Sequence, residues 1–394
     1  VWRHMPPLFI MDIFFDKYAD AIIECALKIK EGDVLSINTE EENGEFAKLL
    51  AAKAKAITGN GSYIQRLEKG RIVENYDFMS SSPLTKAPTC FVYIPLFKAF
   101  PKLEGDREYD AADLQSFKLL SDPLDNPPPT LPFVTCPLPT DDWDQVLDEY
   151  GSSSSSILYN ILSLERDDFI SYLKRKEESV RYLVKFFNGL DLDKCRIADD
   201  EGTDLEFSFL KGSTFNSSFI ETVTERVFCP TITSSDIYRL MDPTSLTGWL
   251  NISKPIVLWG EIITNLSIRF NGGKIVEYSS NPKGEALMDL YLRQDPLSGR
   301  ASMITLSEVS SPLFDEDITL IPEYDRMRAI SITVGGPKGE AVKEDDIKGT
   351  VDSLLSLSLP LGRESTVITA LDKDGEEITI YSGGYFMDEE DDNE

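Results

Sequence analysis

KGEALMDLYL (residues 283–292) and TLSEVSSP (residues 305–312) carry the clearest structural signal in the chain. The first segment has Ala286, Leu287, Leu290 and Tyr291 at helical spacing, which predicts a short helix. The second predicts a strand that ends at Glu308, just before a Ser-Ser-Pro break. A carboxylate at a strand end is a suitable ligand for a divalent metal ion. Further ligands would have to accompany it, and the remaining sequence must supply them.

Helix and strand patterns alternate in the first half of the chain. Helices are predicted at 16–29 and 44–57, and strands at 34–37, 63–67, 90–96 and 133–136. Strands that alternate with helices predict parallel βαβ units. The last two strands are almost continuously apolar, as is typical of strands covered on both faces. An α/β domain with a mostly parallel sheet is therefore expected over residues 11–190.

After residue 190 the pattern changes to short strands separated by turns. Strands are predicted at 206–209, 265–270, 274–278, 329–334, 367–371 and 378–381. Asn271-Gly272-Gly273 predicts a hairpin turn, and residues 201–205 are interpreted as a turn that starts a strand. A β-rich domain is therefore expected over residues 191–387, and the whole chain is assigned to the α/β plus α+β classes.

The two ends of the chain are expected to lie outside these domains. Residues 1–10 are interpreted as an N-terminal extension of little structural weight, because Met5 or Met11 is a suitable natural start. Residues 388–394 are predicted to be a disordered acidic tail.

Charge and cysteine content exclude several classes of partner. The net charge is −29, from 68 acidic and 39 basic residues, which disfavours nucleic acids and anionic membrane surfaces. No apolar run approaches the roughly 20 residues that span a bilayer. The five cysteines include no closely spaced pair and lie in or beside apolar runs, which indicates reduced, buried thiols. A cytoplasmic location is expected.

The 394 residues include a single histidine, His4, in the N-terminal extension. This excludes catalytic systems in which a histidine activates a serine or cysteine. It also removes the imidazole ligands that zinc and cobalt sites usually contain. Any chemistry must therefore depend on carboxylates, lysine, tyrosine, arginine or backbone groups.

Several segments, taken in order, resemble the thermophilic-type metalloaminopeptidases, the aminopeptidase S and aminopeptidase T family. They cover nearly the whole chain from Met11, and their order and spacing are more specific than any one of them. The resemblance implies an α/β domain, a β-rich domain, and a homodimer that encloses a two-metal site. The segments are 17–19, 132–133 with Pro139 and Trp143, 201–205, 225–228, 271–276, 283–286, 308–309 and 311–312.

The family's metal ligands can be placed on this sequence position by position. The resemblance implies that Glu308 and Asp352 keep the acidic ligands. The other ligand positions are substituted, with Arg226 and Arg326 replacing glutamates and Ser331 and Thr350 replacing histidines. The register of the Thr350–Asp352 match is the least secure of these.

Two carboxylates cannot hold two divalent ions, and an arginine would repel them because it keeps its positive charge. We therefore hypothesise that Arg226 and Arg326 fill the former metal space and neutralise Glu308 and Asp352. The alternative is that the two acids are ordinary solvated or salt-bridged residues and the two arginines are surface charges.

Three functions remain open from the sequence. The favoured one is a non-catalytic relative of the metalloaminopeptidases that binds a peptide or protein and needs no cofactor. The second is an active aminopeptidase that recruits Glu221, Glu225 or Glu323 around zinc, cobalt or manganese. The third is a structural acidic scaffold whose former cavity has collapsed.

Overall fold

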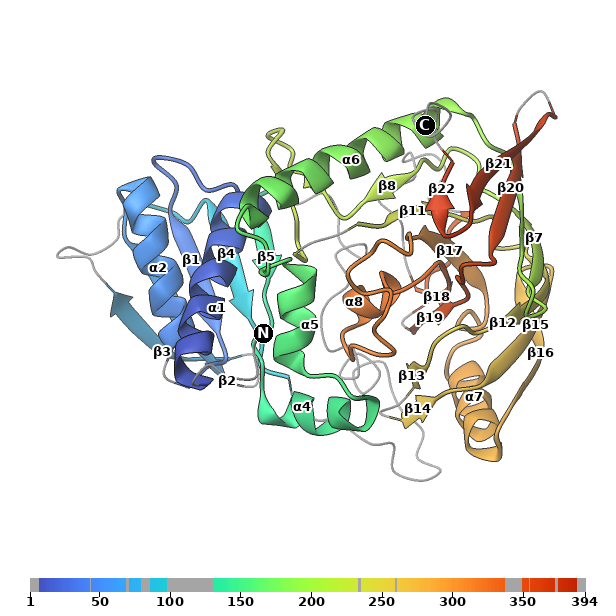
Figure 1. Cartoon of the computed structure of the whole chain (residues 1–394), viewed down its shortest axis with the longest axis horizontal. Helices are drawn as coiled ribbons and strands as arrows, with labels where there is room; N and C mark the ends of the chain where they lie inside the picture. The colour runs from blue at the N-terminus through green and yellow to red at the C-terminus, as the bar shows by residue number, and fades with distance from the viewer. Residues whose placement is uncertain are drawn as a thin grey trace. The chain divides into compact units, whose positions relative to one another are not determined.

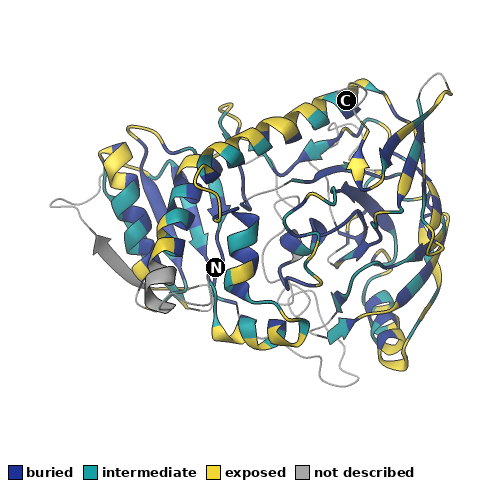
Figure 2. Cartoon of the chain, in the orientation of Figure 1, coloured by how far each residue is buried: buried dark blue, intermediate teal, exposed yellow. Residues whose placement is uncertain are grey.

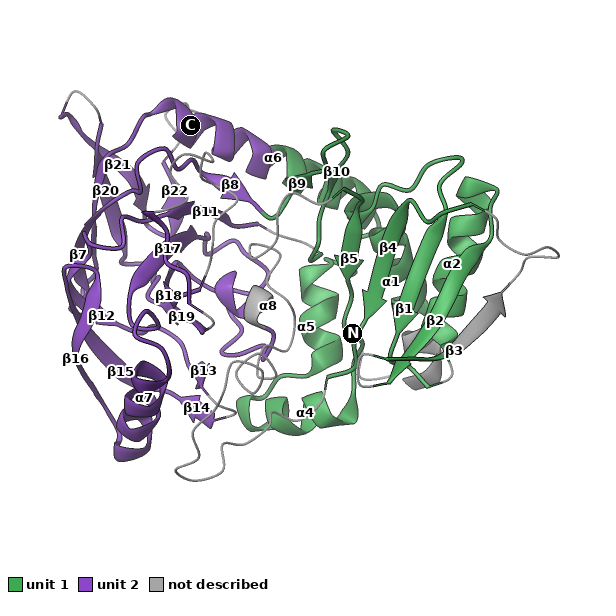
Figure 3. Ribbon diagram, turned by 180° about the vertical axis from the view of Figure 1, so that it is seen from behind, with its two compact units in different colours: residues 1–98, 128–178, 218–234 green, residues 99–127, 179–217, 235–394 purple. Residues whose placement is uncertain are grey.

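The computed structural model describes ten stretches of the chain, which form two compact units that Figure 3 colours separately. Unit 1 includes residues 1–98, 128–178 and 218–234, and unit 2 the remainder. The predicted acidic tail, 388–394, and residues 1–6 of the predicted extension lie outside the described residues. The described stretches are 7–42, 44–68, 71–78, 86–97, 130–232, 235–258, 261–336, 349–353, 355–372 and 375–387.

Unit 1 is built on a five-stranded sheet in the order β3-β2-β1-β4-β5. The pairs β1–β2, β1–β4 and β4–β5 are parallel, and only β3 runs antiparallel to its neighbour. This confirms the mostly parallel sheet predicted from the alternating pattern. The strands are β1 (Leu35–Thr39), β2 (Ser62–Glu68), β3 (Arg71–Phe78), β4 (Cys90–Ile94) and β5 (Phe133–Thr135).

The parallel strands of unit 1 are buried more deeply on one face than on the other. Ile37, Ile64, Val92 and Val134 lie in register across the sheet and are inaccessible to solvent. Residues one position away, such as Phe91 and Phe133, are half-buried. The second face is therefore covered less completely than the first, and Figure 2 colours the sheet by this burial.

The helices of unit 1 follow the predicted pattern with one local difference. The first, α1 (Pro7–Ala21), begins earlier than the predicted helix and continues as a π-helical turn, Ile22–Ala26. In this turn the N–H of Leu27 donates to the carbonyl of Ile22, five residues earlier, at 2.9 Å. The other helices are α2 (Glu45–Thr58), α4 (Asp141–Leu147), α5 (Ser154–Ile161) and the longer α6 (Phe169–Gly189), whose C-terminal residues belong to unit 2.

Unit 2 contains two larger antiparallel sheets (Figure 1). The five-stranded sheet has the order β19-β18-β17-β11-β8, and the eight-stranded sheet has the order β16-β15-β12-β7-β6-β20-β21-β22. This confirms the β-rich domain. The strands of the five-stranded sheet are β8 (Asn216–Ser217), β11 (Ile237–Leu240), β17 (Ala301–Leu306), β18 (Ser331–Gly335) and β19 (Ser356–Pro360).

The eight-stranded sheet contains the predicted hairpin, β15–β16. Its strands are β6 (Lys194–Ala198), β7 (Asp204–Ser208), β12 (Thr247–Asn251), β15 (Leu266–Asn271), β16 (Lys274–Ser280), β20 (Val367–Leu371), β21 (Glu377–Ser382) and β22 (Tyr385–Phe386). A small hairpin, β13 (Ile256–Leu258) and β14 (Glu261–Ile263), completes the strands described in unit 2. Among the helices the structure describes, none is both long and apolar enough to cross a membrane.

The two segments quoted first form a helix and a central strand of unit 2. Helix α7 (Pro282–Gln294) begins after Asn281, whose side chain accepts a hydrogen bond from the N–H of Gly284 at 2.8 Å. Strand β17 lies between β11 and β18, and all six of its residues are buried. It ends at Leu306, two residues before Glu308, so the carboxylate lies beyond the strand rather than on it.

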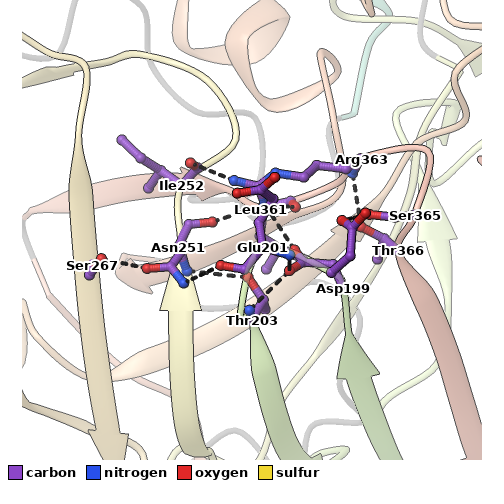
Figure 4. A network of polar contacts seen from close by, with 11 residues as sticks. Asp199, Glu201, Thr203, Asn251, Ile252, Ser267, Leu361, Arg363, Ser365 and Thr366 are labelled. Carbon is purple, nitrogen blue, oxygen red and sulfur yellow. Dashed lines mark hydrogen bonds and ion pairs between the residues drawn. The ribbon is translucent and has the colours of Figure 1, made fainter.

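The predicted turn at residues 201–205 belongs to a network of hydrogen bonds at one end of the eight-stranded sheet (Figure 4). The buried carboxylate of Asp199 accepts from the backbone N–H groups of Glu201 and Thr203, at 2.9 and 3.0 Å. Its second oxygen accepts from Arg363 at 2.8 Å, and Arg363 also donates to the carbonyl of Ile252 at 2.9 Å. Asp199 thus joins three chain segments, and the turn is structural, as interpreted.

We expect Asp199→Asn to lower the free energy of unfolding by about 2 kcal/mol, because it removes the counter-ion of a largely buried arginine. Urea denaturation of the variant and the wild type measures this loss. The matched control is Asp204→Asn, because Asp204 forms a comparable pair with Arg196, at 2.9 and 3.1 Å, on the exposed surface. This control should leave the urea midpoint almost unchanged. Equal losses in both variants would show that Asp199 has no special structural role.

Candidate functional site

Arg326, one of the substituted ligand positions, is buried over the five-stranded sheet of unit 2. It ends the short helix α8 (Pro322–Arg326), which packs against β19. Its Nε atom lies 3.6 Å from Oδ2 of Asp236, and the two side chains are 7% and 0% exposed. The guanidinium carbon lies 5.9 Å from the centre of the Tyr238 ring. A permanent positive charge with its own buried counter-ion therefore occupies this place.

Ser331, a second substituted position, is the first residue of β18 and is fully buried. It lies directly opposite Thr305 on β17 and Pro360 on β19. Since Thr305 is in turn paired with Tyr238 on β11, Ser331 belongs to the same region of the sheet as Arg326 and Asp236. The structure thus brings together two of the positions that the resemblance assigns to the metal site.

Glu308, the retained acid, holds the C-terminal hairpin of unit 2 in place. One carboxylate oxygen accepts from the backbone N–H of Phe386 in β22 at 3.1 Å. The other accepts from the hydroxyl of Ser310 at 2.9 Å. The N–H of Val309 donates to the carbonyl of Gly384 at 2.9 Å, which reinforces the same junction. Both carboxylate oxygens of Glu308 therefore take part in local structure.

Asp352, the other retained acid, lies in a short described stretch, residues 349–353, and its side chain is exposed to solvent. Thr350, two residues before it, is half-buried. Catalytic metal sites hold their ligands in an enclosed environment, and the exposure of Asp352 differs from that.

Arg226 lies in unit 1, in the turn between β9 (Ile220–Glu221) and β10 (Val227–Phe228). It makes a two-pronged ion pair with Asp33, with nitrogen–oxygen distances of 3.0 and 2.9 Å. It also donates to the carbonyls of Leu27 and Lys28, at 2.9 and 3.3 Å, just beyond the π-helical turn. Arg226 therefore joins this hairpin to the end of the first helix.

The electrostatics of Asp33 are consistent with this pairing. Burial raises the pKa of the Asp33 carboxyl, but hydrogen bonds from the N–H of Lys30 and from the Arg226 guanidinium lower it, and the net pKa is below the ordinary value. Asp33 therefore carries its negative charge across the whole neutral range.

The structure gives each of the two arginines an ion-pair partner that the hypothesis did not name. Arg226 is engaged by Asp33, and Arg326 has Asp236 as an ion-pair partner. Neither partner was suggested by the sequence. Asp33 stands between a helix and a strand, and Asp236 directly precedes β11, in segments without a recognisable motif. Only their spatial proximity to an arginine identifies them.

The residues that the structure describes do not bring together the ligands of a two-metal site. Within the described stretches, no three His, Cys, Asp or Glu side chains lie close enough together to hold a metal ion. Glu221 and Glu225, candidates for an alternative ligand set, are exposed residues of unit 1. The side chain of the third candidate, Glu323, lies outside the described part of the structure.

Comparison with known proteins identifies relatives of this fold. The chain is 23% identical to Aminopeptidase T of Thermus aquaticus over 197 residues, or 47% of each chain. It is 21% identical to Aminopeptidase 2 of Geobacillus stearothermophilus over 238 residues, which cover 58% of this chain and 57% of the relative. The chain thus spans about half the length of the curated relatives it matches.

A solved structure matches over almost the entire chain. Wild-type AmpT from Thermus thermophilus superposes with a TM-score of 0.73 and 16% sequence identity, covering 96% of this chain and 100% of that one. This likeness shows a shared fold. Residues 128–386 match the family model described as thermophilic metalloprotease (M29). Because this match covers more than half of the chain, the protein belongs to the thermophilic metalloprotease (M29) family.

Proposed function

We propose that this protein is a non-catalytic member of the M29 family that binds peptides or proteins without cleaving them. The observation that carries the proposal is the buried Arg326–Asp236 ion pair, with Arg326 at a position that the resemblance assigns to a metal ligand. A divalent ion beside Arg326 would be repelled by a charge that cannot be removed near neutral pH.

The other positions that the resemblance assigns to metal ligands support the same proposal. Ser331 offers a neutral hydroxyl in place of an imidazole, and Glu308 uses both carboxylate oxygens in hydrogen bonds to β22 and Ser310. Asp352 is exposed. The M29 family is metal-dependent, and a pair of divalent ions needs several converging anionic or imidazole ligands. The described residues do not provide such a set.

Peptide or protein binding is proposed because the relatives are named aminopeptidases, and such enzymes act on peptides. A fold that keeps the architecture of AmpT while replacing the metal ligands can retain recognition and lose hydrolysis. A homodimer in the cytoplasm is part of the same proposal, and light scattering of the purified protein tests the oligomeric state.

We expect the purified protein to contain well below one metal ion per chain after dialysis against zinc, cobalt or manganese. It should also show no chelator-sensitive release of p-nitroaniline from leucine p-nitroanilide. Elemental analysis and absorbance measure the two results, and Aminopeptidase T treated in parallel is the positive control. Stoichiometric metal together with chelator-sensitive turnover would identify an active aminopeptidase and overturn the proposal.

Arg326→Met should lower the free energy of unfolding by about 3 kcal/mol, because it removes a positive charge that lies beside the buried carboxylate of Asp236. The double variant Arg326→Met with Asp236→Leu should recover much of this loss, since it removes both charges. Urea denaturation measures all three proteins. If the single variant is as stable as the wild type and gains stoichiometric zinc, Arg326 only blocks a metal site that is otherwise intact.

A further inference from the structure

The β15–β16 hairpin of unit 2 contains one of the four Asn-Gly pairs in the sequence. An Asn-Gly pair is prone to modify itself, because glycine has no side chain to shield its backbone nitrogen from the carboxamide of the preceding asparagine. Asn60, Asn188 and Asn271 begin the three pairs that the structure describes, whereas Asn43 lies outside the described residues. The hydrogen bonds of each carboxamide decide which of the three pairs can react.

Two of these asparagines have side chains that are held in place by hydrogen bonds. The Asn188 carboxamide, in the last turn of α6, accepts from the N–H of Phe215 at 2.7 Å and donates to its carbonyl at 2.9 Å. The carboxamide of Asn60 donates to the carbonyls of Gly32 and Asp33, at 3.0 and 2.9 Å. Neither carboxamide can turn toward the following backbone nitrogen unless these bonds break.

The carboxamide of Asn271 has no such restraint. Asn271 is the last residue of β15 and lies opposite Lys274, the first residue of β16. It is exposed to solvent, and its side chain forms no hydrogen bond with any residue that the structure describes. The carboxamide carbon is therefore open to attack.

The backbone nitrogen that would attack this carbon belongs to Gly272. The turn consists of Gly272 and Gly273, whose φ angles of +58° and +74° are typical of a two-residue hairpin turn. The hydrogen bond of a β-turn joins its first and fourth residues, and in the described part of the chain the N–H of Gly272 has no backbone acceptor. A Cβ atom on Gly272 would meet only the carbonyl oxygen of Thr244, at 3.8 Å. The space beside the nitrogen is therefore open as well.

The second glycine of the turn, in contrast, is built into the rest of unit 2. The N–H of Gly273 donates to the carbonyl of Leu246 at 2.8 Å, and the carbonyl of Gly273 accepts from the N–H of Ala301 at 2.9 Å. Ala301 is the first residue of the buried strand β17. A Cβ atom on Gly273 would lie 1.9 Å from the carbonyl oxygen of Pro243. The tip of the hairpin therefore cannot shift without losing these contacts.

We propose that Asn271 is a site of spontaneous deamidation. The nitrogen of Gly272 forms a bond to Cγ of Asn271, and the bond from Cγ to the side-chain nitrogen breaks. That nitrogen leaves as ammonia with the proton of the Gly272 N–H, and a succinimide ring remains. Water then opens the ring. Attack on the side-chain carbonyl gives aspartate with a normal main chain, and attack on the backbone carbonyl gives isoaspartate, whose main chain is one carbon longer.

The two products have different effects on the hairpin. Both add one negative charge, but only isoaspartate lengthens the chain between β15 and the turn. A two-residue turn has no spare residue to absorb the added atom. Isoaspartate at position 271 therefore separates Gly273 from Leu246 and Ala301, and the hairpin tip loosens as the protein ages.

Incubation of the purified full chain in mildly alkaline buffer, followed by peptide mapping with mass spectrometry, tests the site. Deamidation should be at least about tenfold faster at Asn271 than at Asn60 or Asn188, because the hydrogen bonds of those two side chains must break first. Asn271→Gln should abolish the modification at this position on the same timescale, since glutamine would have to close a larger ring. Chromatography separates the aspartate peptide from the isoaspartate peptide, which has the same mass.

Hydrogen exchange of the N–H groups of Gly273 and Ala301 tests the loosening of the tip. Both groups should exchange faster in aged wild type than in fresh wild type, and aged Asn271→Gln should not change. Asn271→Asp is the matched control, because it adds the same charge with a normal main chain, and it should exchange like fresh wild type. The inference is overturned if Asn271 deamidates no faster than Asn60 and Asn188, or if aged wild type and aged Asn271→Gln exchange equally fast.

Discussion

A guanidinium group keeps its positive charge even when it is buried, and this constraint governs the centre of unit 2. Asp236, which has no exposed surface, supplies a negative charge 3.6 Å from the buried Arg326. Removing either residue would take a buried counter-charge away from the other, which destabilises a fold. The pair therefore fixes the electrostatic character of the region where the resemblance places a metal site.

Similar arginine–aspartate pairs occur elsewhere in the described part of the chain, including one in each unit. Arg226 is bound by Asp33 in unit 1, and Arg363 is bound by Asp199 in unit 2. In both pairs the arginine also donates to backbone carbonyls of another segment, so each pair joins pieces of chain that are distant in sequence.

The sequence predicts the fold well because helix and strand patterns are local. The spacing of Ala286, Leu287, Leu290 and Tyr291 predicts α7, and the turn at 271–273 predicts the β15–β16 hairpin. The candidate site was much less predictable. Asp33 and Arg226 are 193 positions apart, and no pattern in either segment indicates the pairing. Likewise, the position of Ser331 opposite Thr305 depends on the register of β17 and β18, which a periodic pattern does not specify.

The contacts of Arg226 bear on how this chain could have diverged from its relatives. Its guanidinium donates to the Asp33 carboxylate and to the carbonyl oxygens of Leu27 and Lys28, which follow the first helix. The carboxylate carries a negative charge, and each carbonyl oxygen carries a partial negative charge. A glutamate in its place would face repulsion from each of these groups. The glutamate that the resemblance assigns to this position would therefore destabilise this structure unless Asp33 changed with it.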